Sequence, residues 1–144
     1  QYSAIGLSPH AVAREHLTFI CEHGGSYTWR DDITVSLIDT LFDSPAEPVL
    51  ATFDLDVVDQ SQAPGVSAPA VAGLNAGLWL YAAFRAGCAP AVKSFDLVEL
   101  SPRLDSDRQT VRLGALTIWS VLSGLSERVW PSVTGITSLA EPAA

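Results

Sequence analysis

Residues 52–59 read Thr52-Phe53-Asp54-Leu55-Asp56-Val57-Val58-Asp59, and this stretch decides the fold. It continues an apolar run, Val49–Phe53, which predicts a strand of a parallel sheet covered on both faces, because the run lacks regular apolar–polar alternation. Asp54 and Asp56 follow at a spacing of two, which places both carboxylates on the same side of an extended chain. Adjacent carboxylates repel each other unless a cation lies between them, so the pair predicts a divalent-metal site. The alternative is a solvated or helix-capping acidic pair.

The segments on either side of this stretch alternate between strand and helix patterns. The alternation predicts an α/β fold, a three-layer α/β/α sandwich around a mainly parallel sheet. A loop over residues 56–73 interrupts the pattern, and long loops inside compact domains are usually functional. The domain is expected over residues 1–130, with a loose tail over 131–144. Strands are expected at 2–7, 26–29, 49–53 and 92–97, and helices at 10–22, 33–41, 75–86 and 109–125.

Short polar residues and a glycine mark the expected helix ends. Asp31 or Asp32 is expected to cap the second helix, and Asn75 the third. Gly87 is expected to end the third helix. Asp105 and Asp107 precede the fourth helix and are expected to cap it; Arg103 would pair with them or with a substrate carboxylate.

Composition excludes several classes of function. The chain has 144 residues, of which 48% are hydrophobic, and this suffices for one domain with a real core. Its 16 acidic and 8 basic residues give a net charge of −8. Since Lys and Arg form no cluster, we expect no nucleic-acid partner. No apolar run reaches the roughly 18 residues of a membrane span, so no membrane partner is expected either.

Cysteine and tryptophan residues carry further expectations. Cys21 and Cys88 are far apart and form no CxxC motif, which predicts free, buried thiols in a reducing compartment and a cytoplasmic location. Trp79 and Trp119 lie on apolar helix faces and are expected in the core. The chain starts with Gln1 instead of Met, which suggests that it begins partway through a longer protein.

Acidic residues follow two of the expected strands. Asp54 and Asp56 come after the strand at 49–53, and Glu99 comes after the strand at 92–97. Ligands of parallel α/β sheets bind at the carboxyl ends of the strands. We therefore expect these three carboxylates at one functional edge. For Glu99 the alternative is a structural carboxylate that accepts hydrogen bonds from loop amides.

Three motifs together resemble the ureohydrolase superfamily, which contains arginase, agmatinase and formimidoylglutamase. They are the stretch Asp54–Asp59, the turn Ala63-Pro64-Gly65, and the later Asp96-Leu97-Val98-Glu99-Leu100-Ser101-Pro102. The resemblance extends from about Val49 to Leu125. The wording Gly65-Val66-Ser67-Ala68-Pro69-Ala70 is most similar to formimidoylglutamase.

The resemblance implies an arginase-like α/β fold and a pair of Mn²⁺ ions bridged by hydroxide. It implies that Asp54 is a catalytic residue and a bridging metal ligand, and that Asp56 is a ligand of one ion. Glu99 matches the catalytic acidic residue that binds the substrate's cationic nitrogens, and a carboxylate suits that cation. The implied reaction converts the small molecule N-formimidoyl-L-glutamate to glutamate and formamide. Agmatinase or arginase, which act on guanidines and release urea, remain alternatives.

The chain also departs from the family pattern. Gln60 stands where the family usually has Pro, and Ser101 where Asn is commoner. The upstream ligand motifs Gly-Gly-x-His and Asp-x-His-x-Asp are absent, and His10, His16 and His23 are expected at the surface. The chain thus resembles the C-terminal part of a ureohydrolase, incomplete on its N-terminal side and inactive alone. A non-catalytic α/β domain that acts in assembly is the competing hypothesis, and a homo-oligomer is possible in either case.

Overall fold

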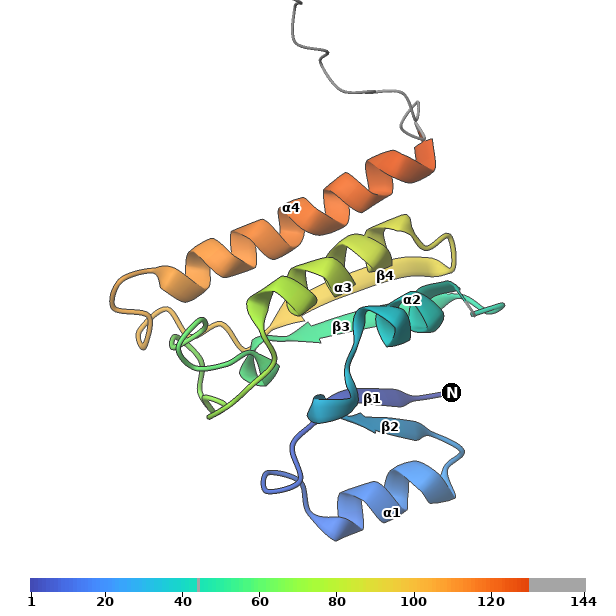
Figure 1. Ribbon diagram of the computed structural model, residues 1–144, viewed down its shortest axis with the longest axis horizontal. Helices are drawn as coiled ribbons and strands as arrows, with labels where there is room; N and C mark the ends of the chain where they lie inside the picture. Colours follow the sequence, from blue (N-terminus) through green and yellow to red (C-terminus); the bar gives the residue numbers. More distant parts are fainter. Residues whose placement is uncertain (44, 130–144) are drawn as a thin grey trace, which may run out of the picture.

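The computed structural model describes residues 1–43 and 45–129, so the expected tail over 131–144 lies outside the described residues. Strands and helices alternate as predicted (Figure 1). The strands form two parallel pairs, the first strand with the second and the third with the fourth. The elements are β1 (Ser3–Leu7), α1 (Arg14–Glu22), β2 (Ser26–Trp29), α2 (Val35–Asp43), β3 (Val49–Asp54), α3 (Ala76–Cys88), β4 (Val92–Val98) and α4 (Gln109–Val129).

The pair of strands β3 and β4 is covered on one face. Ala51 pairs with Phe95 and Phe53 with Leu97, and these apolar residues belong to the same core as residues of α3 and α4. Figure 1 shows the ribbons of β3, β4, α3 and α4. Leu50 points to the other face and is 62% exposed. The expectation that β3 is covered on both faces is therefore wrong for the described residues, because both helices pack on the same side.

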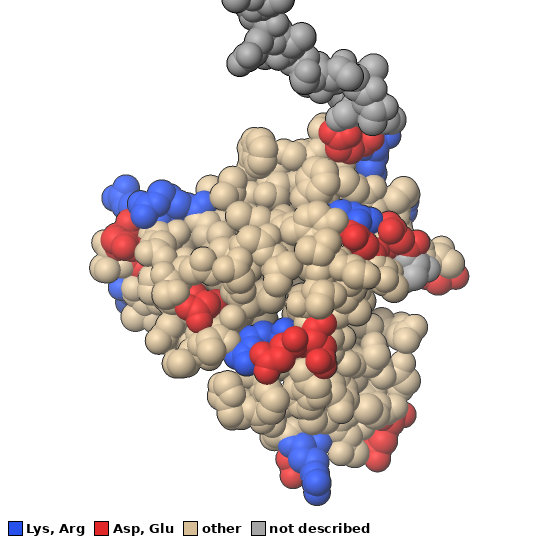
Figure 2. All heavy atoms as spheres, viewed as in Figure 1, with Lys and Arg blue, Asp and Glu red and all other residues tan. Residues whose placement is uncertain are grey.

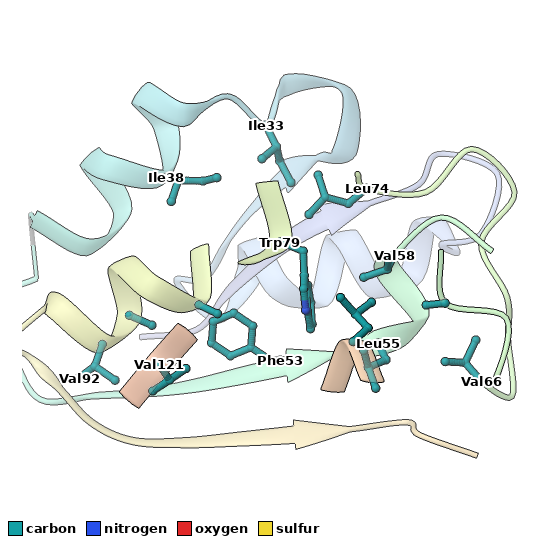
Figure 3. Packing of buried hydrophobic residues seen from close by; sticks show 14 of the residues in the cluster. Ile33, Ile38, Phe53, Leu55, Val58, Val66, Leu74, Trp79, Val92 and Val121 are labelled. Atoms are coloured by element: carbon teal, nitrogen blue, oxygen red, sulfur yellow. The ribbon is translucent and has the colours of Figure 1, made fainter. Parts of the chain in front are cut away.

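Trp79 is the centre of the core between β3 and α4 (Figure 3). Its ring meets the edge of Phe53 with centroids 5.2 Å apart, and its Nε1 donates a hydrogen bond to Thr117 Oγ1 at 2.7 Å. Trp79 is thus a core residue, as predicted. Trp119 is not, because it is 63% exposed. Thr117 and Val121 are buried on α4, and a residue two positions from each lies about 200° around a helix.

The crossing of α3 and α4 depends on two glycines. Gly87 was expected to end α3, but α3 continues to Cys88 and Gly87 is buried where α4 crosses it. A Cβ built on Gly87 would lie 2.9 Å from the Cα of Gly124. Arg128 of α4 also donates hydrogen bonds to the carbonyl oxygens of Ala86, Gly87 and Val92. The two helices are therefore in backbone contact, which only glycine at the crossing permits.

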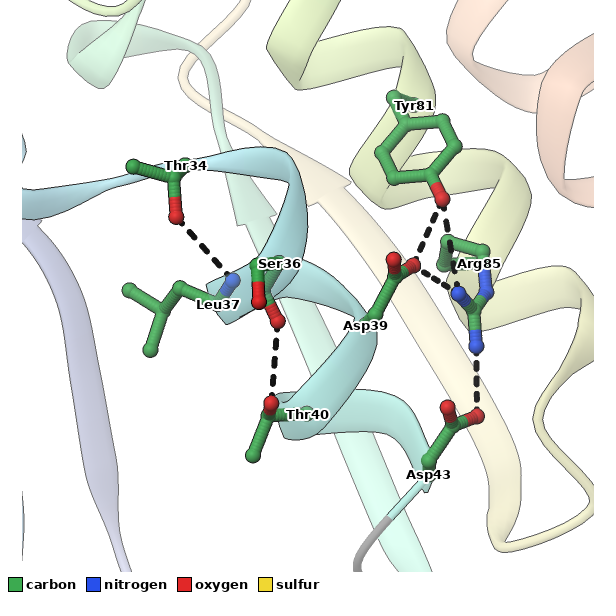
Figure 4. A network of polar contacts seen from close by, with 8 residues as sticks. All are labelled: Thr34, Ser36, Leu37, Asp39, Thr40, Asp43, Tyr81 and Arg85. Atoms are coloured by element: carbon green, nitrogen blue, oxygen red, sulfur yellow. Dashed lines mark hydrogen bonds and ion pairs between the residues drawn. The ribbon is translucent and has the colours of Figure 1, made fainter.

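An ion-pair network ties α2 to α3 (Figure 4). Arg85 of α3 pairs with Asp39 and, at 2.5 Å, with Asp43 of α2. Tyr81 donates a hydrogen bond to Asp39 Oδ1 at 2.6 Å. The Arg85 and Asp39 side chains are 18% and 35% exposed, so this pair is partly shielded from water, whereas Asp43 is 69% exposed and its pair contributes little.

The predicted N-terminal cap is confirmed for α3 and wrong for α2. Asn75 Oδ1 accepts a hydrogen bond from the Gly77 amide at 2.7 Å, as predicted. On α2 the cap is Thr34, whose Oγ1 accepts from the Leu37 amide at 3.2 Å (Figure 4). Asp31 and Asp32 instead lie in a 3₁₀ helix, Arg30–Asp32, which ends before α2 begins.

The surface carries scattered charges and two accessible thiols. On the face shown in Figure 2, basic groups lie beside acidic ones. Both cysteines are free thiols, as predicted. Cys21 is exposed and Cys88 is half-buried, so the expectation that both thiols are buried is wrong. The three histidines are exposed, as predicted. Across residues 1–43 and 45–129, no helix combines the length and apolar character that crossing a membrane requires.

Candidate metal and substrate site at the strand ends

Asp54 is the last residue of β3, and its carboxylate starts the turn that follows. Its Oδ1 accepts a hydrogen bond from the Asp56 amide at 2.9 Å, which caps the 3₁₀ helix Leu55–Val57. Leu55 and Val58 are fully buried on either side of Asp56 and anchor this turn in the core (Figure 3). The spacing of the two carboxylates had suggested that the strand continues through Asp56. Instead, this capping turn follows Asp54 and places Asp56 next to it.

Asp56 lies in the negative field of two other carboxylates. Burial raises the pKa of Asp56 above its ordinary value, and the charges of Asp54 and Glu99 raise it further, although the Ala68 amide lowers it by hydrogen bonding. The Ala68 nitrogen lies 3.5 Å from Asp56 Oδ1. Asp54 pairs with Val98 of β4, so Glu99, which follows Val98, lies at the same edge of the strand pair as Asp54 and Asp56. A cation bound beside Asp54 and Asp56 would relieve the repulsion between these two carboxylates.

Glu99 follows β4 and has a backbone conformation that is unusual for residues other than glycine. Its φ is 68°, in the left-handed region, which costs about 1–3 kcal/mol for a residue other than glycine. Glu99 Oε2 lies 3.1 Å from Ser67 Oγ. Strain of this kind is typical of functional sites. The partner in this contact is a side-chain hydroxyl.

The long loop over residues 58–74 is organised by Asp59. Its carboxylate accepts hydrogen bonds from the Ser61 amide at 2.9 Å, the Ser61 hydroxyl at 2.5 Å and the Gly73 amide at 3.0 Å. These bonds lower the pKa of Asp59, with the Ser61 hydroxyl as the largest cause. Asp59 therefore secures the loop. Arg30, which the sequence did not single out, donates a hydrogen bond to the Ala72 carbonyl from the end of β2.

Asp105 supports the loop from the other side. It is 4% exposed, and it accepts hydrogen bonds from the amides of Thr110 at 3.0 Å and Val111 at 2.8 Å at the start of α4. A Cβ built on Gly65 would lie 2.7 Å from Asp105 Cγ, so glycine is required at that position of the loop. Asp107 accepts from the Gln109 amide at 3.1 Å. Both aspartates thus cap α4, as predicted; among the described residues Arg103 forms no ion pair with either.

Replacing Asp105 with asparagine should destabilise the chain by about 1–2 kcal/mol at pH 7. Asparagine has one acceptor oxygen for the two backbone amides, and its NH₂ group would face the second amide donor without a hydrogen bond. Burial opposes ionisation of Asp105, but the amides of Thr110 and Val111 outweigh it, so the pKa of Asp105 lies below its ordinary value. A lowered pKa in the folded state gives stability that is present above the unfolded pKa and lost as the pH falls through the folded one.

Urea denaturation at several pH values would measure this effect. The gap between wild type and Asp105→Asn should be full at pH 7 and shrink below about pH 4, the ordinary pKa of aspartate. Asp107→Asn is the matched control, because Asp107 caps the same helix from an exposed position. Equal and pH-independent losses in the two variants would show that Asp105 is no more than a surface cap.

Asp54 and Asp56 would supply only part of a metal site. Carboxylate oxygens are ligands that Mn²⁺ accepts, and Asp54 and Asp56 offer two such groups at one strand end. Within the part of the chain that the structure describes, no group of three or more His, Cys, Asp and Glu side chains is placed to hold an ion. Two carboxylates leave most of a coordination sphere to other groups. The pair therefore fits a metal site as a contributor and does not complete one.

Comparison with known proteins gives the class to which this fold and site belong. A model of the arginase family matches residues 6–124, and the chain belongs to that family. The formimidoylglutamase of Lysinibacillus sphaericus is 30% identical over 131 residues, which cover 86% of this chain and 41% of that protein. The formimidoylglutamase of Staphylococcus epidermidis is 42% identical over 69 residues, or 48% of this chain and 22% of that protein.

Solved structures confirm the α/β arginase-like fold. A crystal structure of Trypanosoma cruzi formiminoglutamase with Mn²⁺ has a TM-score of 0.82 at 24% identity and covers 88% of this chain and 43% of that one. Arginase from Bacillus caldovelox has a TM-score of 0.72 at 25% identity and covers 85% and 42%, respectively. The chain thus spans less than half the length of these relatives.

Proposed function

We propose that this chain is part of a manganese-dependent hydrolase of linear amidines whose substrate is N-formimidoyl-L-glutamate. The observation that supports the proposal is the position of Asp54, Asp56 and Glu99 at one edge of the β3–β4 pair, where Asp54 pairs with Val98, in an arginase-family chain. The formimidoylglutamase relatives support the choice of substrate.

In the proposed reaction, water adds its oxygen to the amidine carbon, and the bond from that carbon to the glutamate nitrogen breaks. The leaving nitrogen takes up a proton, and the products are glutamate and formamide. Manganese, where bound, would activate the attacking water by lowering its pKa. Asp54 and Asp56 contribute carboxylates to the metal site, and Glu99 holds the cationic nitrogens of the amidine by charge-assisted hydrogen bonds.

Two other functions have support. Agmatinase- or arginase-like release of urea is supported by the family match and by the likeness to Bacillus caldovelox arginase. A non-catalytic assembly domain is supported by the absence of a third ligand beside Asp54 and Asp56 among the described residues.

We also propose that the protein is cytoplasmic and associates with copies of itself. Two free cysteines suit a reducing compartment. The apolar side chains exposed on α4, among them Ile118, Leu122 and Val129, would suit contacts with another chain.

The test is an assay of the protein in its full length with Mn²⁺, beside the 144-residue chain. We expect the full-length protein to release formamide from N-formimidoyl-L-glutamate and the 144-residue chain to be inactive, because its described residues offer only two carboxylates. Urea release from agmatine or L-arginine would instead support the second function. A full-length protein that binds Mn²⁺ in native mass spectrometry but hydrolyses none of the three would contradict both enzymatic proposals.

A further inference from the structure

One short segment of the long loop touches both acidic strand ends. Val66 pairs with Leu100 in an antiparallel bridge, and the Ser101 amide donates a hydrogen bond to the Gly65 carbonyl at 2.8 Å. Val66 is fully buried, and the Gly65 amide donates to the buried Thr110 Oγ1 at 2.7 Å. The segment Gly65–Ala68 is therefore fixed against the chain that follows β4.

The two residues after Val66 each contact one carboxylate of the candidate site. Ser67 Oγ lies 3.1 Å from Glu99 Oε2, and the Ala68 nitrogen lies 3.5 Å from Asp56 Oδ1. An ionised carboxylate only accepts hydrogen bonds, so the Ser67 hydroxyl is the donor to Glu99. The same two residues thus set the position of Glu99 relative to the acidic pair.

We infer that Ser67 is a positioning residue for Glu99. Its hydroxyl holds Oε2 and leaves Oε1 to bind a cationic nitrogen of the substrate. A glutamate side chain has three rotatable bonds, and one charge-assisted hydrogen bond removes much of this freedom before substrate binds. The left-handed backbone of Glu99 and the Val66–Leu100 bridge fix the other end of the residue. This inference rests on the proposed function, because it assigns Glu99 to the amidine.

The experiment compares Ser67→Ala with Ser67→Thr in the full-length protein, by kinetics with N-formimidoyl-L-glutamate. Loss of a hydrogen bond to a charged group should raise KM by about 10- to 100-fold in Ser67→Ala, with a smaller change in kcat. Threonine keeps the hydroxyl and should restore most of the wild-type KM. The number of Mn²⁺ ions bound should not change in either variant, because Ser67 contacts Glu99 and not the acidic pair.

A double-mutant cycle with Glu99→Gln separates positioning from a general structural role. Ser67→Ala should add little to the loss already caused by Glu99→Gln, since the hydroxyl acts through that carboxylate. Ser126→Ala is the matched control, because it removes a 2.7 Å hydroxyl hydrogen bond at the far end of α4.

Each outcome decides between the inference and the function on which it rests. An active wild type with a Ser67→Ala variant of unchanged KM would overturn the role of Ser67 and leave the proposed function standing. Additive losses in the cycle would overturn it too. A wild type that binds Mn²⁺ but hydrolyses no amidine would overturn both.

Discussion

Asp54→Asn should reduce hydrolysis by the full-length protein by roughly a thousandfold or more, well beyond the 10- to 100-fold typical for partners of metal ligands. Asparagine removes the negative charge that a cation requires, but its side-chain oxygen can still accept the hydrogen bond that Asp54 takes from the Asp56 amide at 2.9 Å. The turn after β3 should therefore survive, and the loss should be one of metal binding and not of folding.

Native mass spectrometry with Mn²⁺, together with formamide release, measures this result. Asp107→Asn is the control, because Asp107 caps the amide two residues on at 3.1 Å in the same way, outside the acidic cluster. Its Mn²⁺ stoichiometry and activity should equal those of the wild type. Asp54→Ala adds a second comparison, since it removes the cap as well and should also lower stability by about 1 kcal/mol. If Asp54→Asn keeps its Mn²⁺ and its activity, Asp54 is a capping residue and no more.

The order of elements, and the position of the acidic residues at one edge of a strand pair, could both be predicted from the sequence. Apolar periodicity and helix caps such as Asn75 are local signals, and local signals suffice to place strands and helices. The shared edge of Asp54, Asp56 and Glu99 followed from one general property of parallel sheets, that the strand ends lie at one edge.

The features that the sequence did not reveal depend on contacts between distant residues. Ser67 and Glu99 are 32 positions apart, and no pattern within either segment links a hydroxyl to that carboxylate. Several residues near Trp119 in the sequence are apolar, as they are around a core residue. The buried side of α4, however, is the one that crosses α3, and Trp119 lies on the other side. Thr34, and neither Asp31 nor Asp32, caps α2 because α2 begins at Val35, whereas both aspartates lie in the separate 3₁₀ helix that precedes it.

Gly87 shows most clearly why a local signal can mislead. A glycine near the end of a helical pattern usually marks the end of the helix, and that was the prediction. In the structure its lack of a side chain serves tertiary packing, because a Cβ there would lie 3.0 Å from the Leu125 amide of α4. Glycine at a crossing and glycine at a helix end look the same in one sequence.

Gly124→Ala should destabilise the chain by about 3 kcal/mol or more, the upper range for overpacking in a core. A Cβ on Gly124 would meet the carbonyl oxygen of Phe84 and lie 2.8 Å from the Cys88 amide. Both are backbone atoms of α3, so no side-chain rotation can relieve the contact, and α3 and α4 would have to move apart. The Arg128 hydrogen bonds across this crossing would weaken with them.

Gly114→Ala provides the control within the same helix. A Cβ on Gly114 would lie 3.4 Å from Leu97 Cδ2, a flexible side-chain end that can shift slightly. Alanine is a better helix former than glycine by about 1 kcal/mol, so Gly114→Ala should be neutral or slightly stabilising in urea denaturation. The opposite signs of the two changes would show that the crossing, and not helix propensity, determines the effect at Gly124. If both variants have the wild-type urea midpoint of unfolding, α3 and α4 are not in the close backbone contact that the structure shows at Gly124.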